Sequence, residues 1–114
     1  MDHLHNIKEV DNIKNYMIKH SVIFKLSHPQ GSAQEKIFFN AAHELASING
    51  VEKFECLRQT SKNNHYDFGI SMEFANEELY RQYNSHPLHV KFIEEYWLTS
   101  VTEFMEIDYE PLTK

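Results

Sequence analysis

Cysteine is nearly absent from this chain of 114 residues, which contains Cys56 and no other. One thiol cannot form a disulfide within the chain, and it cannot supply the several cysteines of a structural zinc site. Basic clusters are also lacking: 17 acidic residues outnumber 11 lysines and arginines, and the net charge is −6 at pH 7. Because nucleic acids and anionic membranes bind basic surfaces, we expect neither as a partner.

Long apolar runs, a signal peptide, repeats and low-complexity segments are missing as well. A helix that crosses a bilayer needs about 20 apolar residues, so we expect no membrane span and, by default, a cytoplasmic protein. The length is typical of one domain that buries roughly 65% of its unfolded surface. We place that domain at residues 17–111. Residues 1–16 form an N-terminal extension, either a short docked helix or a loosely held arm.

Hydrophobic patterning is what the chain does have. Four segments alternate with the period of a strand, and three others carry apolar residues at helical spacing. The strands are expected at residues 17–26, 51–60, 68–74 and 101–110. The first helix is expected at residues 32–48, where a capping box at Ser32 begins it and Asn49-Gly50 ends it. A short second helix is expected after the cap Asn76. The third is expected at residues 87–99, and Pro87 begins it.

This order of elements, β-α-β-β-α-α-β, predicts a ferredoxin-like α+β fold, in which an antiparallel sheet carries its helices on one face. The other face must also be covered if it is apolar. Four apolar residues fall on it by alternation: Ile23, Met105, Ile107 and Tyr109. We therefore expect a symmetric homodimer.

The segment from residue 83 to 92 holds the strongest candidates for a functional site. It contains two histidines, His86 and His89, around Pro87. If Pro87 is the first helical residue, His89 lies in the first turn and shares a face with apolar residues of the same helix. The positive end of the helix disfavours an imidazolium there, so we expect a neutral His89 that faces the interior. Such a residue is either a proton acceptor or a satisfied core histidine.

Several segments together resemble the stress-responsive A/B barrel (Dabb) family, over about residues 17–111. The segments are Met17-Ile18-Lys19-His20, Ile48-Asn49-Gly50-Val51, Tyr66-Asp67, Tyr83-x-x-His86-Pro87-x-His89-Val90-x-Phe92 and Ile107-Asp108-Tyr109-Glu110-Pro111. The resemblance implies a homodimeric α+β barrel in which two sheets close on each other. Most members have no assigned activity. One branch, similar to plant polyketide cyclases, closes a linear polyketide by aldol chemistry without a cofactor, in a pocket between sheet and helices.

The resemblance to that branch implies four roles. His89 falls at the position of the catalytic base, Asp108 at that of its orienting carboxylate, and Tyr83 at that of a tyrosine that holds the substrate. His20 falls at the position of a strand histidine near the pocket. Removal of a proton next to a carbonyl needs a base such as His89, and the resulting enolate oxygen needs a donor such as Tyr83 or His20.

The chain departs from that branch at three positions. Ala42 and Phe68 stand near a tyrosine and a histidine of the cyclase, and Glu106 stands where the family usually has an apolar residue. These differences argue against the cyclase's own substrate and leave the acid–base group in place. Glu106 is either an exposed strand residue after a bulge or a pocket carboxylate with a raised pKa.

We therefore expect an interior pocket for a small carbonyl-bearing or aromatic molecule, with neither a metal nor another cofactor. The residues expected to bind the ligand, besides the catalytic ones, are His20, His86, Glu106, Phe24 and Phe92.

Three alternatives stay open. The His89–Asp108 pair can be purely structural and satisfy buried polar groups in a dimeric domain. The pocket can belong to a stress-related binding protein that performs no turnover. His86 and His89 can hold a metal with a nearby carboxylate, although Pro87 distorts their spacing and a third ligand is not obvious.

Overall fold

Strand β1 (Ile18–Leu26) runs through the middle of a four-stranded antiparallel sheet with the order β2-β3-β1-β4. In the computed structural model, which describes residues 16–112, β1 lies between β3 (Phe68–Phe74) and β4 (Val101–Tyr109). Strand β2 (Glu52–Arg58) forms the edge beside β3. Most of the predicted N-terminal extension lies outside the described residues.

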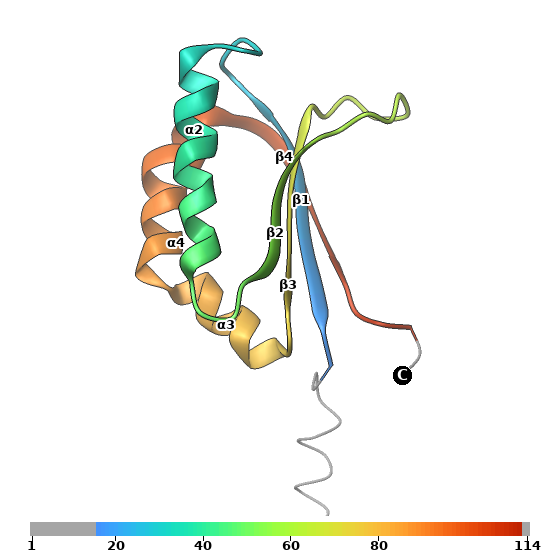
Figure 1. Ribbon diagram of the computed structural model, residues 1–114. Helices are drawn as coiled ribbons and strands as arrows, with labels where there is room; N and C mark the ends of the chain where they lie inside the picture. The colour runs from blue at the N-terminus through green and yellow to red at the C-terminus, as the bar shows by residue number, and fades with distance from the viewer. Residues whose placement is uncertain (1–15, 113–114) are drawn as a thin grey trace, which may run out of the picture.

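The alternation predicted for β1 is confirmed, because every second residue, starting with the first, is buried: Ile18, His20, Val22, Phe24 and Leu26. These side chains face the helices, which lie on one side of the sheet (Figure 1). One of the five is a histidine, so the sheet carries a buried polar group into the helix-facing layer.

Helix α2 (Ala33–His43) begins as predicted at Ser32, whose hydroxyl accepts a hydrogen bond from the backbone N–H of Glu35. Its last turn is a 3-10 helix, η1 (Glu44–Ser47), where a continuous α-helix was expected. The chain then reverses at Gly50, which has φ +95° and would place a Cβ 3.1 Å from a methyl carbon of Leu79. Only glycine adopts this conformation readily, so the predicted stop is confirmed.

Helix α3 (Glu77–Ser85) begins at Asn76, whose side chain accepts a hydrogen bond from the N–H of Leu79. Helix α4 (Pro87–Phe92) follows with Pro87 in its first turn, as expected. The helix continues through a π turn, η2 (Ile93–Trp97), and ends in α5 (Leu98–Ser100). None of the helices in residues 16–112 is both long and apolar enough to cross a membrane.

The π turn changes which residues of this helix face the core. Regular α-helical spacing predicts an inward row that continues from Phe92 to Ile93 and Tyr96. The π turn closes over five residues instead of four, and Trp97 follows Phe92 by five. Trp97 is accordingly buried, whereas Ile93 and Tyr96 are only half-buried.

Aromatic rings fill the core between the sheet and the helices. Phe24 has no exposed surface, and its ring centre lies 5.0 Å from that of Trp97, 5.7 Å from that of Phe38 and 5.8 Å from that of Phe68. Tilted rings at 4.5–7 Å are favourable, and a buried aromatic side chain contributes about 2–3 kcal/mol to folding. This packing fixes β1 against α2 and the end of the last helix.

The opposite face of the sheet bears none of the helices of residues 16–112, and it carries apolar residues of β1 and β4 beside charged ones such as Lys19 and Lys25. The register pairs Ile23 with Met105 and Ser21 with Ile107, so these side chains point away from the helices, as predicted. Met105 is 48% exposed and Tyr109 is 55% exposed. We refer to Ile23, Met105, Ile107 and Tyr109 as the open face.

Candidate functional site: the helix–sheet pocket

A hollow of about 330 Å³ lies between the helices and strands β1, β3 and β4. We call it the helix–sheet pocket. Its walls are mostly aliphatic and aromatic, and five polar side chains reach it: His20, Tyr83, Asn84, His89 and Glu106. Its size is at the lower end of the range of small-molecule sites, roughly 300–1,000 Å³, and a few polar groups in an apolar cavity are typical of such sites.

His20 is held by a carboxylate on the neighbouring strand. The register places His20 directly opposite Asp108, and the Nδ1 atom of His20 lies 2.6 Å from Oδ1 of Asp108. The imidazole is 7% exposed. A carboxylate can only accept, so the Nδ1 atom of His20 carries the proton of this hydrogen bond.

Tyr80 contacts both His20 and Asp108, and it was not predicted from the sequence. Its hydroxyl donates to Oδ2 of Asp108 at 2.7 Å and lies 2.9 Å from Nδ1 of His20. Burial raises the pKa of Tyr80 far above its ordinary value, and the hydrogen bond to Asp108 raises it further, so the phenol stays protonated. Tyr80 lies three residues before Tyr83 on the same helix face, and this spacing was a usable signal.

Glu106 is a pocket carboxylate. It lies opposite Val22, and the expected bulge precedes it, because the register of β1 and β4 shifts between Val101 and Glu103. Its Oε2 atom lies 3.3 Å from the hydroxyl of Tyr80 and 3.6 Å from Nδ1 of His20. The side chain lines the pocket and is 55% exposed, so the pocket is open to solvent beside it.

His89 reaches the same pocket from the first turn of α4. Its Nδ1 atom lies 3.1 Å from the backbone carbonyl oxygen of Asn84. A carbonyl can only accept, so Nδ1 carries the proton and Nε2 is the acceptor of the neutral ring. Burial lowers the pKa of His89 below its ordinary value of 6.5, although the bond to Asn84 acts in the other direction. The predicted neutral, inward-facing imidazole is therefore present.

The expected pair of His89 and Asp108 is wrong. Both oxygens of Asp108 are used by His20 and Tyr80, and the orienting partner of His89 is the carbonyl of Asn84. The reason is the strand order, because β4 lies next to β1 and places Asp108 across from His20. Asp108 thus positions His20 instead of His89.

Tyr83 lies between the two imidazoles, as a ring that contacts both. Its ring centre is 4.5 Å from that of His89 and 6.2 Å from that of His20. It is 2% exposed. Burial, with a smaller contribution from the charge of Glu106, raises its pKa well above the ordinary value, so its hydroxyl remains a donor at neutral pH.

Two of the expected ligand-binding residues lie elsewhere. Phe24 is enclosed by the core and does not line the pocket. His86 caps α4: its Nδ1 atom accepts a hydrogen bond from the N–H of Leu88 at 3.0 Å, and its side chain does not line the pocket either. That bond occupies one ring nitrogen of His86 and weakens the alternative of a metal held with His89. Phe92 lines the pocket as predicted.

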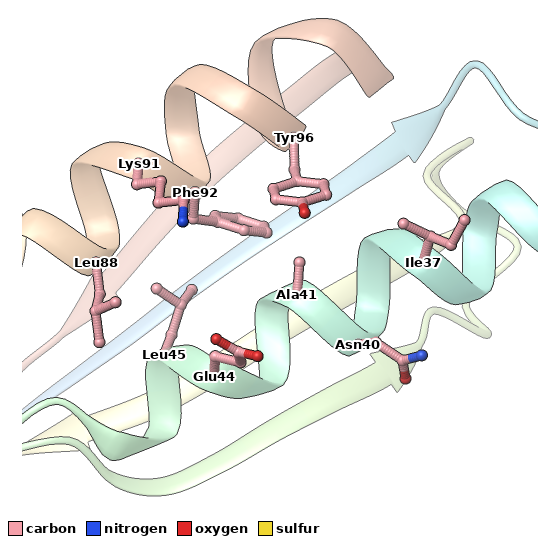
Figure 2. Close-up of a pocket in the computed structure, with 9 residues that line it drawn as sticks. All are labelled: Ile37, Asn40, Ala41, Glu44, Leu45, Leu88, Lys91, Phe92 and Tyr96. Atoms are coloured by element: carbon pink, nitrogen blue, oxygen red, sulfur yellow. The ribbon is translucent and has the colours of Figure 1, made fainter.

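A second hollow, of about 360 Å³, lies on the outer side of the helices, between α2 and α4. Figure 2 shows Leu88 and Tyr96 extending toward Ala41 of α2 and Leu45 of η1. It contains one acidic and one basic side chain, Glu44 and Lys91, and no imidazole. Because it lacks an imidazole, it offers less for general acid–base chemistry than the helix–sheet pocket.

Solved structures of the same fold define the class of this protein. A dimeric ferredoxin-like protein of unknown function from Thermobifida fusca is 17% identical, with a TM-score of 0.72 over 87% of this chain and 94% of that one. A hydroxynitrile lyase from Passiflora edulis is 9% identical, with a TM-score of 0.75 over 88% and 97%. At these identities the likeness shows the ferredoxin-like fold alone. None of the curated proteins matches this chain.

A closer relative and a family model identify the family. A Dabb family protein from Mesorhizobium loti with a ferredoxin-like fold is 48% identical, with a TM-score of 0.83 over 84% of this chain and 97% of that one. The model of the stress responsive A/B barrel domain, Dabb, matches residues 18–111. This chain belongs to the Dabb family.

Proposed function

We propose that this protein binds a small carbonyl-bearing or aromatic molecule in the helix–sheet pocket and acts on it by acid–base chemistry, with His89 as the base. The observation that carries the proposal is the hydrogen bond between Nδ1 of His89 and the carbonyl of Asn84. It fixes the tautomer that leaves Nε2 free to accept a proton, on a residue that lines the pocket.

The protonation state of His89 suits this role. A base must be neutral at the working pH, and burial keeps the pKa of His89 below its ordinary value. The imidazole is therefore unprotonated at pH 7. The positive end of α4, where His89 lies in the first turn, acts in the same direction.

The other polar groups of the pocket suit the second half of the reaction. When Nε2 of His89 takes a proton from the carbon next to a carbonyl, the C–H electron pair forms the enolate and negative charge develops on the carbonyl oxygen. The hydroxyl of Tyr83 is protonated and can donate a hydrogen bond to that oxygen. His20 supplies a second imidazole, oriented by Asp108.

The pocket walls favour an aromatic or otherwise apolar ligand body. Phe92, Trp97 and Phe104 line it, and the ring centres of Trp97 and Phe104 lie 5.6 Å apart. Aromatic side chains contribute large contact areas to an apolar ligand. The hydroxynitrile lyase of the same fold offers an analogy at the level of the fold only.

Exchange of carbon-bound hydrogen tests the proposal without knowledge of the complete reaction. Aryl-alkyl ketones such as phenylacetone are incubated with the protein in D₂O and EDTA, and loss of the α-proton signal is followed by ¹H NMR. We expect exchange by the natural sequence to fall about 10²-fold or more in His89→Gln, which lacks the proton acceptor. His65→Gln, at an exposed histidine that does not line the pocket, is the matched control.

Binding of the same ketones, measured by the rise in unfolding temperature, separates the alternatives. An enzyme loses exchange and keeps most of the binding in His89→Gln. A non-catalytic, stress-related binding protein shows binding without exchange in both forms. Exchange that is equal in the natural sequence and His89→Gln, or absence of binding to all ketones, contradicts the assignment of His89.

We also infer that two copies associate through the open face. This apolar surface includes Met105 and Tyr109, which are about half exposed, and the similar structure from Thermobifida fusca is described as dimeric. Light scattering is expected to give twice the mass of the chain, and Met105→Glu to give the monomer mass. Ile37→Glu, at a similarly exposed apolar residue of α2, is the control. A monomer mass for the natural sequence contradicts this inference.

A further inference from the structure

Three potential metal ligands converge beside the helix–sheet pocket. One ring nitrogen of His20 and one carboxylate oxygen each of Glu106 and Asp108 lie within 4.8 Å of one another. In residues 16–112, no other group of three histidine, cysteine, aspartate or glutamate side chains has this spacing. No metal was expected from the sequence. The adjacency of β1 and β4 brings His20 to the two carboxylates.

The sheet holds the three side chains in place. His20 and Asp108 lie opposite each other on neighbouring strands, and Glu106 is two residues before Asp108, on the same face. The hydroxyl of Tyr80 donates to Oδ2 of Asp108 at 2.7 Å and lies 3.3 Å from Oε2 of Glu106. Hydrogen bonds of this kind orient the ligands of metal sites.

The charge of this group is not balanced by a basic side chain. Among the described residues, the ion pairs of Glu106 and Asp108 are those with His20 alone. The lysines and arginines that form ion pairs there do so with other carboxylates: Lys19 and Lys53 with Glu73, Lys25 with Asp67, and Arg81 with Glu77 and Glu78. A divalent cation would neutralise the charge of the two carboxylates.

We propose that His20, Glu106 and Asp108 form a binding site for a first-row divalent cation, with Zn²⁺ as the best fit. One imidazole and two carboxylates are ligands that Zn²⁺ accepts, and sites with three protein ligands keep a fourth position open. That position would face the helix–sheet pocket, because His20 and Glu106 line it. The proposal does not depend on His89 being a base.

The distances indicate what binding requires. Ligands at about 2.0–2.1 Å from a tetrahedral ion lie about 3.3 Å apart. The His20 and Glu106 atoms are 3.6 Å apart, whereas those of His20 and Asp108 are 2.6 Å apart and share a proton. The ion would replace that proton, and the partly exposed Asp108 carboxylate would rotate outward. Binding therefore releases a proton.

Calorimetric titration of the full chain with Zn²⁺ tests the site. His3 and His5 lie outside the described residues and are replaced by glutamine in every variant, because free imidazoles bind the ion themselves. We expect one Zn²⁺ per chain, with proton release seen as a dependence of the heat on the buffer. We expect about tenfold weaker binding or more in Glu106→Gln, which removes the most exposed of the three ligands.

The matched control is another imidazole–carboxylate pair with the same N–O distance as His20 and Asp108. His65 and Glu103 lie 2.6 Å apart and are both exposed, and no third ligand in the described part of the chain has the required spacing. Glu103→Gln is expected to leave Zn²⁺ binding unchanged. No one-to-one binding by the parent chain, or equal binding by Glu106→Gln with its fold verified by circular dichroism, overturns the proposal. Since the ketone exchange is run in EDTA, it tests His89 independently of this site.

Discussion

His20 and His89 both border the helix–sheet pocket and both carry a proton on Nδ1, but they donate it to different groups. His20 lies in the central strand, with its Nδ1–H bonded to Asp108 and close to Tyr80 and Glu106. His89 lies in a helix start, with its Nδ1–H bonded to a backbone carbonyl. Burial lowers the pKa of His89 and favours its neutral ring, although the bond to Asn84 acts in the other direction. Under the proposed function, His89 is the base and His20 is the imidazole held in place by Asp108.

The pair of His65 and Glu103 shows that a short distance between an imidazole and a carboxylate does not by itself define a functional site. His65 and Glu103 also lie 2.6 Å apart, but their side chains are 61% and 55% exposed. Exposed pairs are weak because water solvates both charges. The difference between this pair and that of His20 with Asp108 lies in burial and in the additional partner, Tyr80.

Asp108→Ala is expected to have the largest effect on stability. It leaves the buried Nδ1–H of His20 without its acceptor and removes the acceptor of the Tyr80 hydroxyl. Loss of hydrogen bonds to a charged group costs about 1–3 kcal/mol in the free energy of unfolding, as measured by urea denaturation. A loss no greater than that of Glu103→Ala would remove the distinction between the buried and the exposed pair.

Tyr80→Phe is expected to cost about 1 kcal/mol in the same measurement. The ring remains stacked on Phe74, with ring centres 5.0 Å apart, so only the hydroxyl is lost. His20 and Asp108 keep their direct bond. An unchanged free energy of unfolding would show that the hydroxyl is not part of the group around His20.

Stability should fall as the pH drops below about 6.5, in part because of His89. The unfolded chain binds a proton at His89 near pH 6.5, and the folded protein binds it only at lower pH. Between the two pKa values the unfolded state holds more protons, so the free energy of unfolding rises with pH there and is lost on acidification. Urea unfolding between pH 5 and 8 is expected to show a shallower decline in His89→Gln. Identical pH profiles would contradict a lowered pKa.

Glu103→Gln is expected to have the smallest effect, within about 0.5 kcal/mol. Its pair with His65 is exposed and therefore screened by salt. The free energy of unfolding at low and high salt measures this contribution. A loss comparable to that of Asp108→Ala would mean that exposure does not separate the two pairs.

The order of elements and the direction of single side chains were predictable from sequence. Alternation in β1 predicts that His20 is buried, and Pro87 places His89 in the first turn of a helix. Both depend on local rules of strand and helix geometry. The apolar residues of the open face follow from the same alternation in β1 and β4.

Partners across the sheet were not predictable in this way. Alternation shows that His20 and Asp108 face the same side, but only the strand order and register show that they lie opposite each other. The carbonyl of Asn84 has no signal in the sequence at all, because every residue has one. Trp97 was missed because a π turn breaks the regular helical spacing.

The tautomer and pKa of His89 test the central claim most directly. Nitrogen-15 NMR of the imidazole rings, assigned with His89→Gln, reports both between pH 5 and 8. We predict a proton on Nδ1, a free Nε2 and a titration midpoint below 6.5. A proton on Nε2, or a midpoint at or above 6.5, would contradict the assignment of His89 as the base.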